Sequence, residues 1–377
     1  MREVAIFRNN LFRISEPFVA QQAQPLQRYK PFYVGRMRFG PPPAGAESVA
    51  VEDLGRWRWP YIGWQMISRD PRSLARLMAA HRPALIHAHF GVDGVYALPL
   101  ARRLKIPLVT TFHGFDATLS TLGFLRSPAW VNYPLFRHQL AKHGDLFLCD
   151  SEFLRARVLA MGFPEARTRL HYIGVDCGQI QVRDPSEETA TVLQVGRLVD
   201  VKGTEYLIRG FALLAKKHPA VQLVSIGDGP LRGALEDLAK SLGIAERIQF
   251  LGARPHADVL SWMRRSAMLV LPSVRTHDGR TEGFGVVMAE AAATGLPVIG
   301  SRSGGIPEGI VDGRSGFLVP ERDPAALASR MDDLLCDPEL RRRMGIQARA
   351  LVEQKFDIRR QTETLEGHYD AVLADAR

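Results

Sequence analysis

Residues 191–215 read TVLQVGRLVDVKGTEYLIRGFALLA. A short run of β-branched and apolar residues comes first, a turn with two glycines follows, and apolar residues then recur at helical spacing. This order predicts a strand over 192–195, a loop, and a helix over 204–217. Such a strand–loop–helix unit is the building block of a parallel sheet covered by helices.

The same alternation runs through the whole chain. In the second half it predicts further strands over 222–226, 248–251, 268–271, 298–300 and 316–319, and helices near 230–242, 256–265, 285–294, 323–335, 338–354 and 358–375. In the first half it predicts strands over 4–7, 32–34, 84–87, 107–111, 146–149 and 170–173, and helices over 16–28, 71–81, 93–104, 130–142 and 151–161. A segment rich in Pro and Gly over 36–48 predicts a loop.

We therefore expect an α/β protein with two doubly wound, Rossmann-like sheets in tandem. A polar stretch over 183–190 predicts a linker between a first domain, 1–182, and a second, 191–357. The last helix, 358–377, is a candidate to cross back to the first domain. Ligands of such sheets lie beyond the carboxyl ends of the strands, so the expected site is a cleft between the domains.

The composition is that of a globular protein, with 46% apolar and 24% charged residues in a chain of 377. The three cysteines lie far apart, which excludes a disulfide framework or a zinc site and favours a reducing cytoplasm. The first residues do not read as a secretory signal, and no stretch reaches the ~20 apolar residues of a membrane span.

The net charge of +9 comes entirely from the first half. Residues 1–182 hold 23 Lys and Arg against 13 Asp and Glu, whereas the remainder holds 26 against 27. This asymmetry favours an anionic partner, with nucleic acid, a phospholipid surface and a phosphorylated lipid as candidates, unless the excess reflects only an Arg-rich composition. No motif favours nucleic acid. A cluster of aromatic and basic residues over 56–64 predicts contact with a membrane interface, unless its tryptophans pack inward.

Two cations follow the strand over 192–195. Arg197 offers a planar fork for oxyanions, and Lys202 places a second positive charge directly before the next helix. Gly196 leaves room for a close approach to the backbone. Fixed cations beside a helix N-terminus predict a diphosphate-binding site, the alternative being a surface loop with two solvated bases.

A second junction between a strand and a helix carries two carboxylates, Glu282 and Glu290. The glycines at 283 and 285 expose N–H groups where the helix over 285–294 begins. On one continuous helix the carboxylates would be roughly 12 Å apart along the axis, beyond the ~5–9.5 Å of glycosidase carboxyl pairs. An extended nucleotide-sugar could span them, or Glu290 is only an exposed helix former.

Four motifs make the chain resemble the family 4 retaining glycosyltransferases. They are Thr111-Phe112-His113-Gly114-Phe115-Asp116, Tyr172-Ile173-Gly174-Val175-Asp176, Gly196-Arg197-x4-Lys202-Gly203, and the E-x7-E of Glu282 and Glu290. In particular the chain is similar to bacterial enzymes of exopolysaccharide and colanic acid synthesis. The resemblance implies the GT-B fold and retaining transfer of a sugar from a UDP- or GDP-sugar to a glycan or lipid-linked acceptor, with no cofactor and no metal.

The resemblance also implies roles for single residues. The implied catalytic residues are His113, Arg197, Lys202 and Glu282; donor binding is implied for Gly196, Arg254, Gly283, Phe284, Gly285 and Glu290, with Asp116, Gly304 and Gly305 as further candidates. The cations would neutralise the donor diphosphate, Glu282 and the backbone over 283–285 would hold the sugar, and Glu290 would bind the ribose. No D-x-D occurs, so no metal-bridged diphosphate is indicated.

The chain departs from the family at Arg8-Asn9-Asn10-Leu11, where many relatives carry a glycine pair, and Ser15-Glu16-Pro17-Phe18 resembles the exopolysaccharide subgroup. Three other functions stay open: a sugar-nucleotide epimerase of the same fold, an inactive carbohydrate-binding regulator, and a dehydrogenase. The last is disfavoured because no G-x-G-x-x-G follows the first strand of either half. The expected location is the cytoplasm, with the basic half at the inner leaflet of the membrane.

Overall fold

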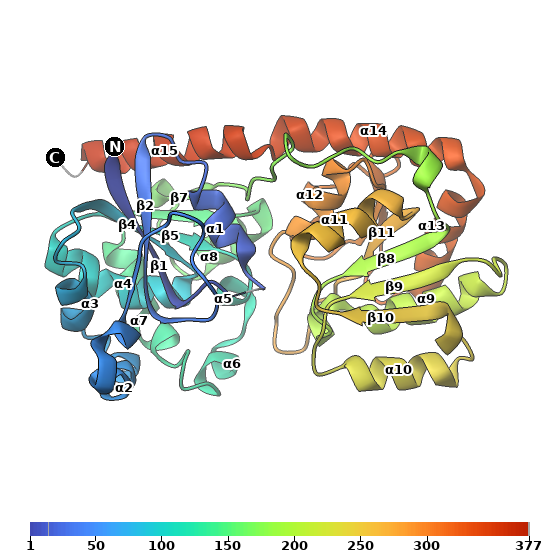
Figure 1. The fold of residues 1–377 in the computed structure, drawn as a ribbon. Coiled ribbons are helices and arrows are strands. Elements are labelled where there is room, and N and C mark those ends of the chain that lie inside the picture. Colours follow the sequence, from blue (N-terminus) through green and yellow to red (C-terminus); the bar gives the residue numbers. More distant parts are fainter. Residues whose placement is uncertain (14, 376–377) are drawn as a thin grey trace. The chain divides into compact units, whose positions relative to one another are not determined.

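The computed structural model describes residues 1–13 and 15–375, and its chain forms two compact units (Figure 1). Unit 1 comprises Met1–Gly174 and Ile358–Arg377, and unit 2 comprises Val175–Asp357. Of the expected final helix, residues 376 and 377 lie outside the described residues. Each unit contains one parallel sheet with helices on both faces, which confirms the predicted α/β architecture.

The sheet of unit 1 has seven strands in the order β3-β2-β1-β4-β5-β6-β7. The strands are β1 (Arg2–Leu11), β2 (Tyr29–Arg38), β3 (Ser48–Ala50), β4 (Pro83–His89), β5 (Leu108–Phe112), β6 (Leu146–Cys149) and β7 (Thr168–Leu170). The helices are α1 (Pro17–Ala23), α2 (Arg58–Ser68), α3 (Arg72–Leu77), α4 (Gly91–Leu104), α5 (Phe115–Thr118), α6 (Thr121–Leu125), α7 (Asn132–His143), α8 (Glu152–Ala160) and α15 (Ile358–Asp375), with the 3-10 turns η1 (Val51–Trp57) and η2 (Glu165–Arg167).

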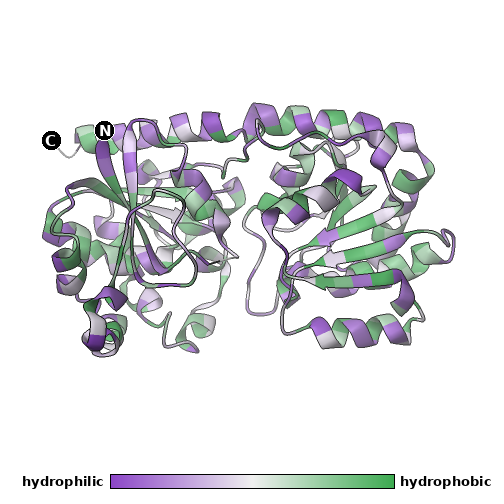
Figure 2. Ribbon diagram, in the orientation of Figure 1, coloured by the Kyte–Doolittle hydropathy of each residue, from purple (hydrophilic) through white to green (hydrophobic). Residues whose placement is uncertain are grey.

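Strand β1 contributes side chains to both hydrophobic cores of unit 1. Ala5 and Phe7 belong to the core on one face of the sheet, and Val4 and Ile6 to the core on the other, because successive side chains of a strand point to opposite faces. Both faces are apolar and both need a cover of helices. The second face is covered in part by α15, through Leu365, Tyr369 and Val372. Figure 2 shows the apolar strands inside each unit and the alternating polarity of the helices around them.

The sheet of unit 2 has six strands in the order β10-β9-β8-β11-β12-β13. The strands are β8 (Thr191–Val195), β9 (Gln222–Ile226), β10 (Ile248–Gly252), β11 (Met268–Leu271), β12 (Val298–Ser301) and β13 (Gly316–Val319). The helices are α9 (Thr204–Ala215), α10 (Arg232–Ser241), α11 (His256–Arg265), α12 (Val286–Ala293), α13 (Pro324–Cys336) and α14 (Pro338–Lys355), with the 3-10 turns η3 (Pro185–Glu187), η4 (Asp200–Lys202), η5 (Ala245–Arg247) and η6 (Ile306–Glu308). Among the helices described, none is at once long and apolar enough to cross a membrane.

The expected linker over 183–190 is part of unit 2, because the division falls earlier, after Gly174. Backbone hydrogen bonds tie this stretch to its own unit: the Arg183 N–H donates to the Thr294 carbonyl at 2.9 Å, and the Thr189 N–H donates to the Arg265 carbonyl at 2.8 Å. Glu188 is also ion-paired with Arg183 and Arg341. The segment is polar because it runs over the surface of a domain, and it does not act as a free connection.

Among the expected boundaries in unit 1 that differ from the observed ones are those of α1, β7 and the loop after β2. Helix α1 ends at Ala23 and not at 28, because Pro25 has no N–H with which to continue the helical hydrogen bonds and its ring would clash with the carbonyl four residues before it. Strand β7 spans Thr168–Leu170 and not 170–173. The expected loop over 36–48 is shorter, since β2 continues to Arg38 and β3 begins at Ser48.

Candidate active site

The first part of the candidate site is the turn between β8 and α9. A Cβ on Gly203 would lie 2.0 Å from the Pro272 carbonyl oxygen, and its φ is 61°, so only glycine fits where the turn meets the end of β11. Gly196 lies beside the Lys202 side chain, whose stem would be 3.5 Å from a Cβ there. The turn thus directs Lys202 toward the end of β11, while Arg197 is exposed.

Lys202 and Glu282 form an ion pair across this junction. The Lys202 Nζ donates to Glu282 Oε2 at 2.5 Å, and the Ser273 hydroxyl donates to the same oxygen at 3.0 Å. The two side chains are 18% and 14% exposed, so the pair is shielded yet reachable. The structure therefore joins two residues that lie eighty positions apart in sequence.

The loop after β12 fixes the backbone of Glu282. A Cβ on Gly304 would lie 1.9 Å from the Glu282 carbonyl oxygen, and the Gly305 N–H donates to that oxygen at 3.2 Å. Gly304 has a φ of 56°, a conformation that favours glycine. These two candidate residues hold the carboxylate in place through its backbone.

Glu282 precedes α12, whereas Glu290 lies within it. The helix begins only at Val286, after Gly285 with a φ of 86°, so the distance expected for two residues of one helix does not apply to this pair. Phe284 is buried, and its ring centroid lies 4.9 Å from that of Phe356. Gly283 and Gly285 flank it.

Glu290 has a partner that sequence reasoning missed. His256 Nε2 lies 2.8 Å from Glu290 Oε1, and this hydrogen bond, more than the charge itself, raises the pKa of His256 above its usual value. His256 opens α11, and the exposed Arg254 precedes it in the same loop. The loop after β10 thus brings Arg254 to the region of Glu290.

A cavity of about 430 Å³ adjoins the turn before α9. Its walls include Val199, Gly203, Thr204, Thr276 and Arg280. Lys202 and Glu282 do not line it, so the cavity and the ion pair are separate features of the same strand ends.

His113 and Asp116 lie in unit 1. The His113 side chain is only 2% exposed: its Nε2 is 3.0 Å from His89 Nδ1, and its Nδ1 is 3.4 Å from Asp150 Oδ2. Burial lowers the pKa of His113 to about 4, so the ring is neutral at pH 7. Phe18 and Phe90 pack on it, each with its ring centroid 4.8 Å away. Both ring nitrogens therefore face protein groups.

Asp116 caps the turn that carries His113. Its carboxylate accepts from the N–H groups of Gly91, His113 and Gly114 at 2.7, 3.2 and 2.9 Å. Burial raises the pKa of Asp116, while these donors act against that rise. The residue holds the His113 backbone in place.

Sequence reasoning also missed Ser273, His89 and Asp150. Each follows or ends a buried strand, but a lone Ser, His or Asp at such a position carries no spacing that marks it. The signal available was the general one that strand carboxyl ends in an α/β sheet collect functional groups.

Two protein-family models match the chain in succession. The model described as Glycosyl transferases group 1 matches residues 179–351, and the model described as Glycosyltransferase Family 4 matches residues 27–179. The first match lies within unit 2, and the second covers most of unit 1.

Several curated proteins are similar in sequence. WcaL of Escherichia coli K12, assigned to colanic acid biosynthesis, is 32% identical over 65% of this chain and 59% of its own length. The amylovoran biosynthesis glycosyltransferase AmsK of Erwinia amylovora is 30% identical over 71% of this chain and 65% of its own. A GDP-mannose-dependent alpha-(1-6)-phosphatidylinositol monomannoside mannosyltransferase of Mycolicibacterium smegmatis is 30% identical over 69% and 70%. The chain thus spans less than two thirds of the length of the first two.

Two solved structures share the fold. HepE of Anabaena, crystallised with UDP and glucose, has a TM-score of 0.79 at 19% identity, covering 98% of this chain and all of that one. Sucrose-phosphate synthase of Thermosynechococcus elongatus has a TM-score of 0.78 at 20% identity, covering both chains fully. These likenesses establish the GT-B fold, and the two successive family matches with the similar sequences establish the lineage. The chain belongs to the family 4 glycosyltransferases.

Proposed function

We propose that this protein is a retaining glycosyltransferase that moves a sugar from a UDP- or GDP-sugar to a glycan or lipid-linked acceptor in bacterial surface polysaccharide synthesis. The observation that carries the proposal is the group at the strand ends of unit 2: Arg197, Lys202 and Glu282 beside the start of α9, and Glu290 on α12. The names of WcaL and AmsK support the pathway class, and the UDP and glucose bound to HepE support a nucleotide-sugar donor.

In the proposed reaction the cations act on the leaving group. The anomeric C–O bond breaks, and its electron pair stays on the terminal phosphate of the nucleoside diphosphate. Arg197, Lys202 and the first N–H groups of α9 stabilise the charge that develops there, so no metal ion is needed. The acceptor oxygen forms the new bond on the same face of the sugar, and its proton passes to the departing phosphate oxygen.

Binding of the donor exchanges the partners of Lys202 and Glu282. Without donor, Lys202 and Glu282 neutralise each other at 2.5 Å. A bound diphosphate offers Lys202 a doubly charged partner and frees the Glu282 carboxylate to accept hydrogen bonds from sugar hydroxyls. Glu290 accepts hydrogen bonds from the ribose hydroxyls, which compete with His256 for its carboxylate.

The test is release of nucleoside diphosphate from a panel of UDP- and GDP-sugars, with and without lipid-linked and glycan acceptors. Acceptor-dependent release together with a glycosylated product of retained anomeric configuration is the expected result. An epimerase would convert the donor without an acceptor, and none of the relatives and structures named above is described as one. Failure of every donor to react would reject the proposal.

We also place the protein in the cytoplasm, bound to the inner leaflet of the membrane through α2. Trp57 and Trp59 are each 57% exposed, and Tyr61, Trp64 and Ile67 are exposed beside them. Arg56 and Arg58 stack on Trp57 and Trp59, whereas the acids nearest in sequence are already paired, Asp53 with Arg38 and Asp70 with Arg72. Among the described residues no acid is paired with Arg56 or Arg58, and aromatic side chains beside such cations suit an anionic lipid interface.

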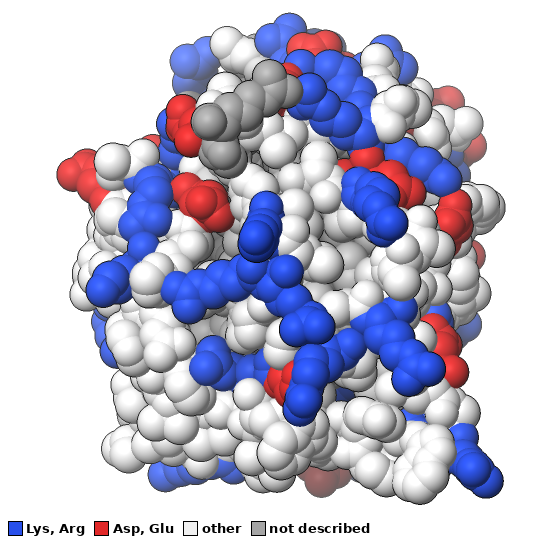
Figure 3. Space-filling view, turned by 90° about the vertical axis from the view of Figure 1, so that its left-hand side faces the viewer, with Lys and Arg blue, Asp and Glu red and all other residues white. Residues whose placement is uncertain are grey.

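The surface of unit 1 agrees with this placement. Figure 3 shows Lys and Arg side chains crowded across the face of unit 1 that lies at the left of Figure 1, with few acidic ones among them and uncharged surface below. Each basic residue near an anionic membrane contributes up to ~1 kcal/mol, and salt screens this attraction.

Sedimentation with phosphatidylglycerol vesicles tests the membrane proposal. We expect binding at low salt that weakens at high salt, and loss of binding when Arg56, Trp57, Arg58 and Trp59 are replaced by Ser. A control that replaces Arg342, Arg343 and the exposed Ile346 on α14 by Ser should bind like the parent protein. Absence of binding at low salt, or equal loss in both variants, would reject α2 as the contact.

A further inference from the structure

Three side chains that can bind a metal ion meet at the surface of unit 2. They are His218, which follows the end of α9, and Asp332 and Cys336 on α13. One ligand atom of each lies within 4.8 Å of the ligand atoms of the other two, and among the described residues no other three His, Cys, Asp or Glu side chains are this close. Cysteine spacing argued against a zinc site, but His218 lies 114 positions before Asp332, so only the folded chain brings the group together.

The packing of α9 on α13 gives these side chains a firm base. A Cβ on Gly210 of α9 would lie 2.8 Å from the carbonyl oxygen of Pro324 at the start of α13, so glycine lets the two helices approach closely. Near the other end of the pair, Leu214 of α9 and Met331 of α13 are buried in the same hydrophobic core. The core therefore holds together the two helices that carry the three side chains.

The backbone of each of the three residues is fixed as well. The His218 N–H donates to the Leu214 carbonyl at 3.1 Å, and the His218 carbonyl accepts from Arg247 Nη2 at 2.7 Å. Asp332 and Cys336 are four residues apart on α13, so their side chains lie on the same face of that helix. Binding of an ion between the three therefore requires only rotation of side chains.

The distances within the group are close to those of a zinc site. Asp332 Oδ1 lies 2.6 Å from His218 Nε2 and 3.7 Å from Cys336 Sγ. In a tetrahedral site with Zn–N and Zn–O bonds of about 2.0 Å and a Zn–S bond of about 2.3 Å, the ligand atoms are about 3.3–3.6 Å apart. The nitrogen and the oxygen would separate by about 0.7 Å to reach this arrangement, and the sulfur is already near its distance from the oxygen.

The three side chains can be reached from solvent. Those of His218 and Asp332 are 25% and 26% exposed, and Cys336 is an exposed free thiol. Lys217 Nζ donates to Asp332 Oδ2 at 2.8 Å. This bond orients the carboxylate and leaves its other oxygen, Oδ1, toward the histidine and the cysteine, as an outer hydrogen bond does for the ligands of known metal sites.

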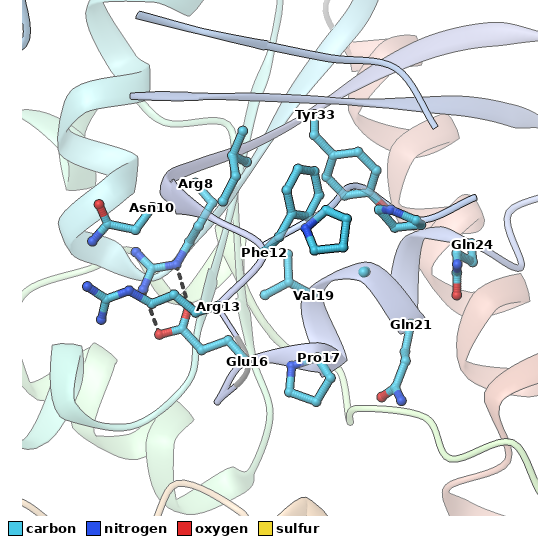
Figure 4. Close-up of a pocket in the computed structure, with 14 residues that line it drawn as sticks. Arg8, Asn10, Phe12, Arg13, Glu16, Pro17, Val19, Gln21, Gln24 and Tyr33 are labelled. Atoms are coloured by element: carbon cyan, nitrogen blue, oxygen red, sulfur yellow. Dashed lines mark hydrogen bonds and ion pairs between the residues drawn. The ribbon is translucent and has the colours of Figure 1, made fainter. Parts of the chain in front are cut away.

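Other carboxylates of the chain lack this arrangement. In the wall of a pocket of about 290 Å³ in unit 1, both oxygens of Glu16 accept from Arg8, at 2.9 and 3.0 Å, as Figure 4 shows. Glu290 has a histidine partner, His256, but in the part of the chain described no third ligand of this kind joins the pair. The group on α9 and α13 thus differs from the ordinary ion pairs of the protein.

We propose that His218, Asp332 and Cys336 bind a zinc ion at the surface of unit 2. Imidazole, carboxylate and thiolate are the ligands that zinc takes in proteins, whereas Mg²⁺ and Ca²⁺ prefer oxygen ligands alone. A water molecule completes the tetrahedron. On binding, the Cys336 thiol gives its proton to the solvent, and bonds from His218 and Asp332 to the metal replace the hydrogen bond between them.

This site is separate from the reaction proposed above. His218 follows the last residue of α9, whereas the turn that carries Lys202 precedes the first. A helix of 12 residues is about 18 Å long, so the zinc ion does not reach the proposed diphosphate site. Its role is structural, because it joins the end of α9 to the end of α13. The inference goes beyond the proposed function and does not depend on it.

Titration with Co²⁺ tests the site, because this ion takes the place of zinc and its absorption reports its ligands. The full chain is stripped with EDTA and kept reduced. A thiolate ligand gives Co²⁺ a charge-transfer band in the near ultraviolet, and this band reports on Cys336 because Cys149 and Cys177 are buried. We expect Co²⁺ to produce the band, Zn²⁺ to remove it, and excess Mg²⁺ to leave it unchanged.

Variants of the ligands distinguish a site of three ligands from a single reactive thiol. Cys336→Ser should abolish the band. His218→Ala and Asp332→Asn should each raise the Kd for Co²⁺ by about 100-fold or more, because loss of an outer partner of a metal ligand already costs about 10–100-fold. The matched control is Asp333→Asn, which removes the neighbouring carboxylate, paired with Arg330, and should bind Co²⁺ like the parent protein.

Thermal unfolding gives a second readout. Zinc binds the folded arrangement in preference, so it should raise the unfolding temperature of the parent and of Asp333→Asn but not that of Cys336→Ser. The same measurement without metal shows whether each variant is folded. Absence of the band, its persistence in Cys336→Ser, or an unchanged Kd in both His218→Ala and Asp332→Asn would each overturn the proposal. Displacement of Co²⁺ by Mg²⁺ would overturn it too, since it indicates oxygen ligands alone.

Discussion

At the scale of single residues, substitution of Lys202 should have the largest effect on the rate of transfer. The residue lies just before α9, whose N-terminus favours an anion, and among the described residues only Glu282 neutralises its Nζ. We expect Lys202→Ala or Arg197→Ala to lower kcat by ~100-fold or more, the scale of one lost transition-state partner. Lys240→Ala, an exposed lysine on α10, is the matched control and should leave the rate unchanged. A folded double variant of Arg197 and Lys202 with full transfer would contradict the diphosphate role.

Replacement of Glu282 and replacement of Glu290 should affect different steps of the reaction. Glu282→Ala should mainly lower kcat, because this carboxylate is released to the donor sugar. Glu290→Ala should weaken binding of free UDP or GDP by ~1–3 kcal/mol, the cost of unpairing buried ribose hydroxyls. Calorimetry on both variants separates them, with His256→Ala as the control for the hydrogen bond that Glu290 makes without ligand. Equal losses of affinity in the two variants would argue against separate roles.

The site residues that could be predicted from the sequence are those whose type and spacing indicate a binding or catalytic role. Lys202 and Glu282 each stand at a glycine-marked junction of a strand and a helix, and Glu290 follows Glu282 at the spacing E-x7-E. His256 and Ser273 could not be found in this way, because their contacts depend on which loops the sheet order brings together. The strand order β10-β9-β8-β11-β12 is a property of the tertiary structure and cannot be predicted from a local sequence pattern.

At the scale of elements, the long periodic helices of unit 2 and its short β-branched strands were predicted within a few residues, because burial enforces their periodicity. Helix α2 was missed. Its sequence holds Pro60 and Gly63, both poor helix formers, and its large side chains face outward, so no inward apolar stripe marks it. The proline is tolerated because it lies in the first turn, where its missing N–H has no acceptor in the helix.

Helix α15 should depend on one carboxylate. Glu366 accepts from the backbone N–H groups of Gln27 and Arg28 at 2.8 and 2.6 Å and from Arg28 Nε at 3.1 Å. Glu366→Ala leaves these donors without a partner, and we expect a loss of about 1–3 kcal/mol in the free energy of unfolding of unit 1.

Urea denaturation followed by tryptophan fluorescence measures this loss, since four of the five tryptophans lie in unit 1. Glu363→Ala, exposed on the same helix, is the control and should change little. A Glu366 variant as stable as the control would mean that water replaces the carboxylate at no cost.

At the scale of the whole molecule, the two units should respond differently to acid. Burial lowers the pKa of the histidines inside unit 1, to about 4 for His113 and His368 and about 3 for His171, with His87 and His89 also well below their usual value. Between these values and about 6.5 the unfolded chain binds more protons than the folded one. Unit 1 therefore keeps its full stability above this window and loses it as the pH falls, by up to about 1.4 kcal/mol per pH unit for each histidine.

Thermal unfolding at several pH values between 7 and about 5 checks the sign of this dependence. His171 has no hydrogen-bond partner for either ring nitrogen in the part of the chain described, so His171→Leu should lessen the dependence by about one proton. Unit 2 should resist acid better in this range, because the pKa of His256 is raised by Glu290 and its protonation favours the folded state. Melting of unit 2 before unit 1 at low pH would contradict this.

The tandem architecture was predictable, because two runs of alternating strands and helices each need a sheet of their own. The place of the division was not, since the polar stretch over 183–190 reads like a connector until its backbone hydrogen bonds to unit 2 are known.

The membership of α15 in unit 1 has a consequence for synthesis on the ribosome. Unit 2 is one continuous stretch and can fold as soon as it emerges, but unit 1 lacks α15 until residues 358–375 have been made. At ~5–20 residues per second, this leaves one face of the first sheet, with Val109 and Leu148, without that cover for roughly 10–40 s. Unit 1 is thus completed after unit 2, although most of it is made before, and the nascent chain meets chaperones with an apolar sheet face still open.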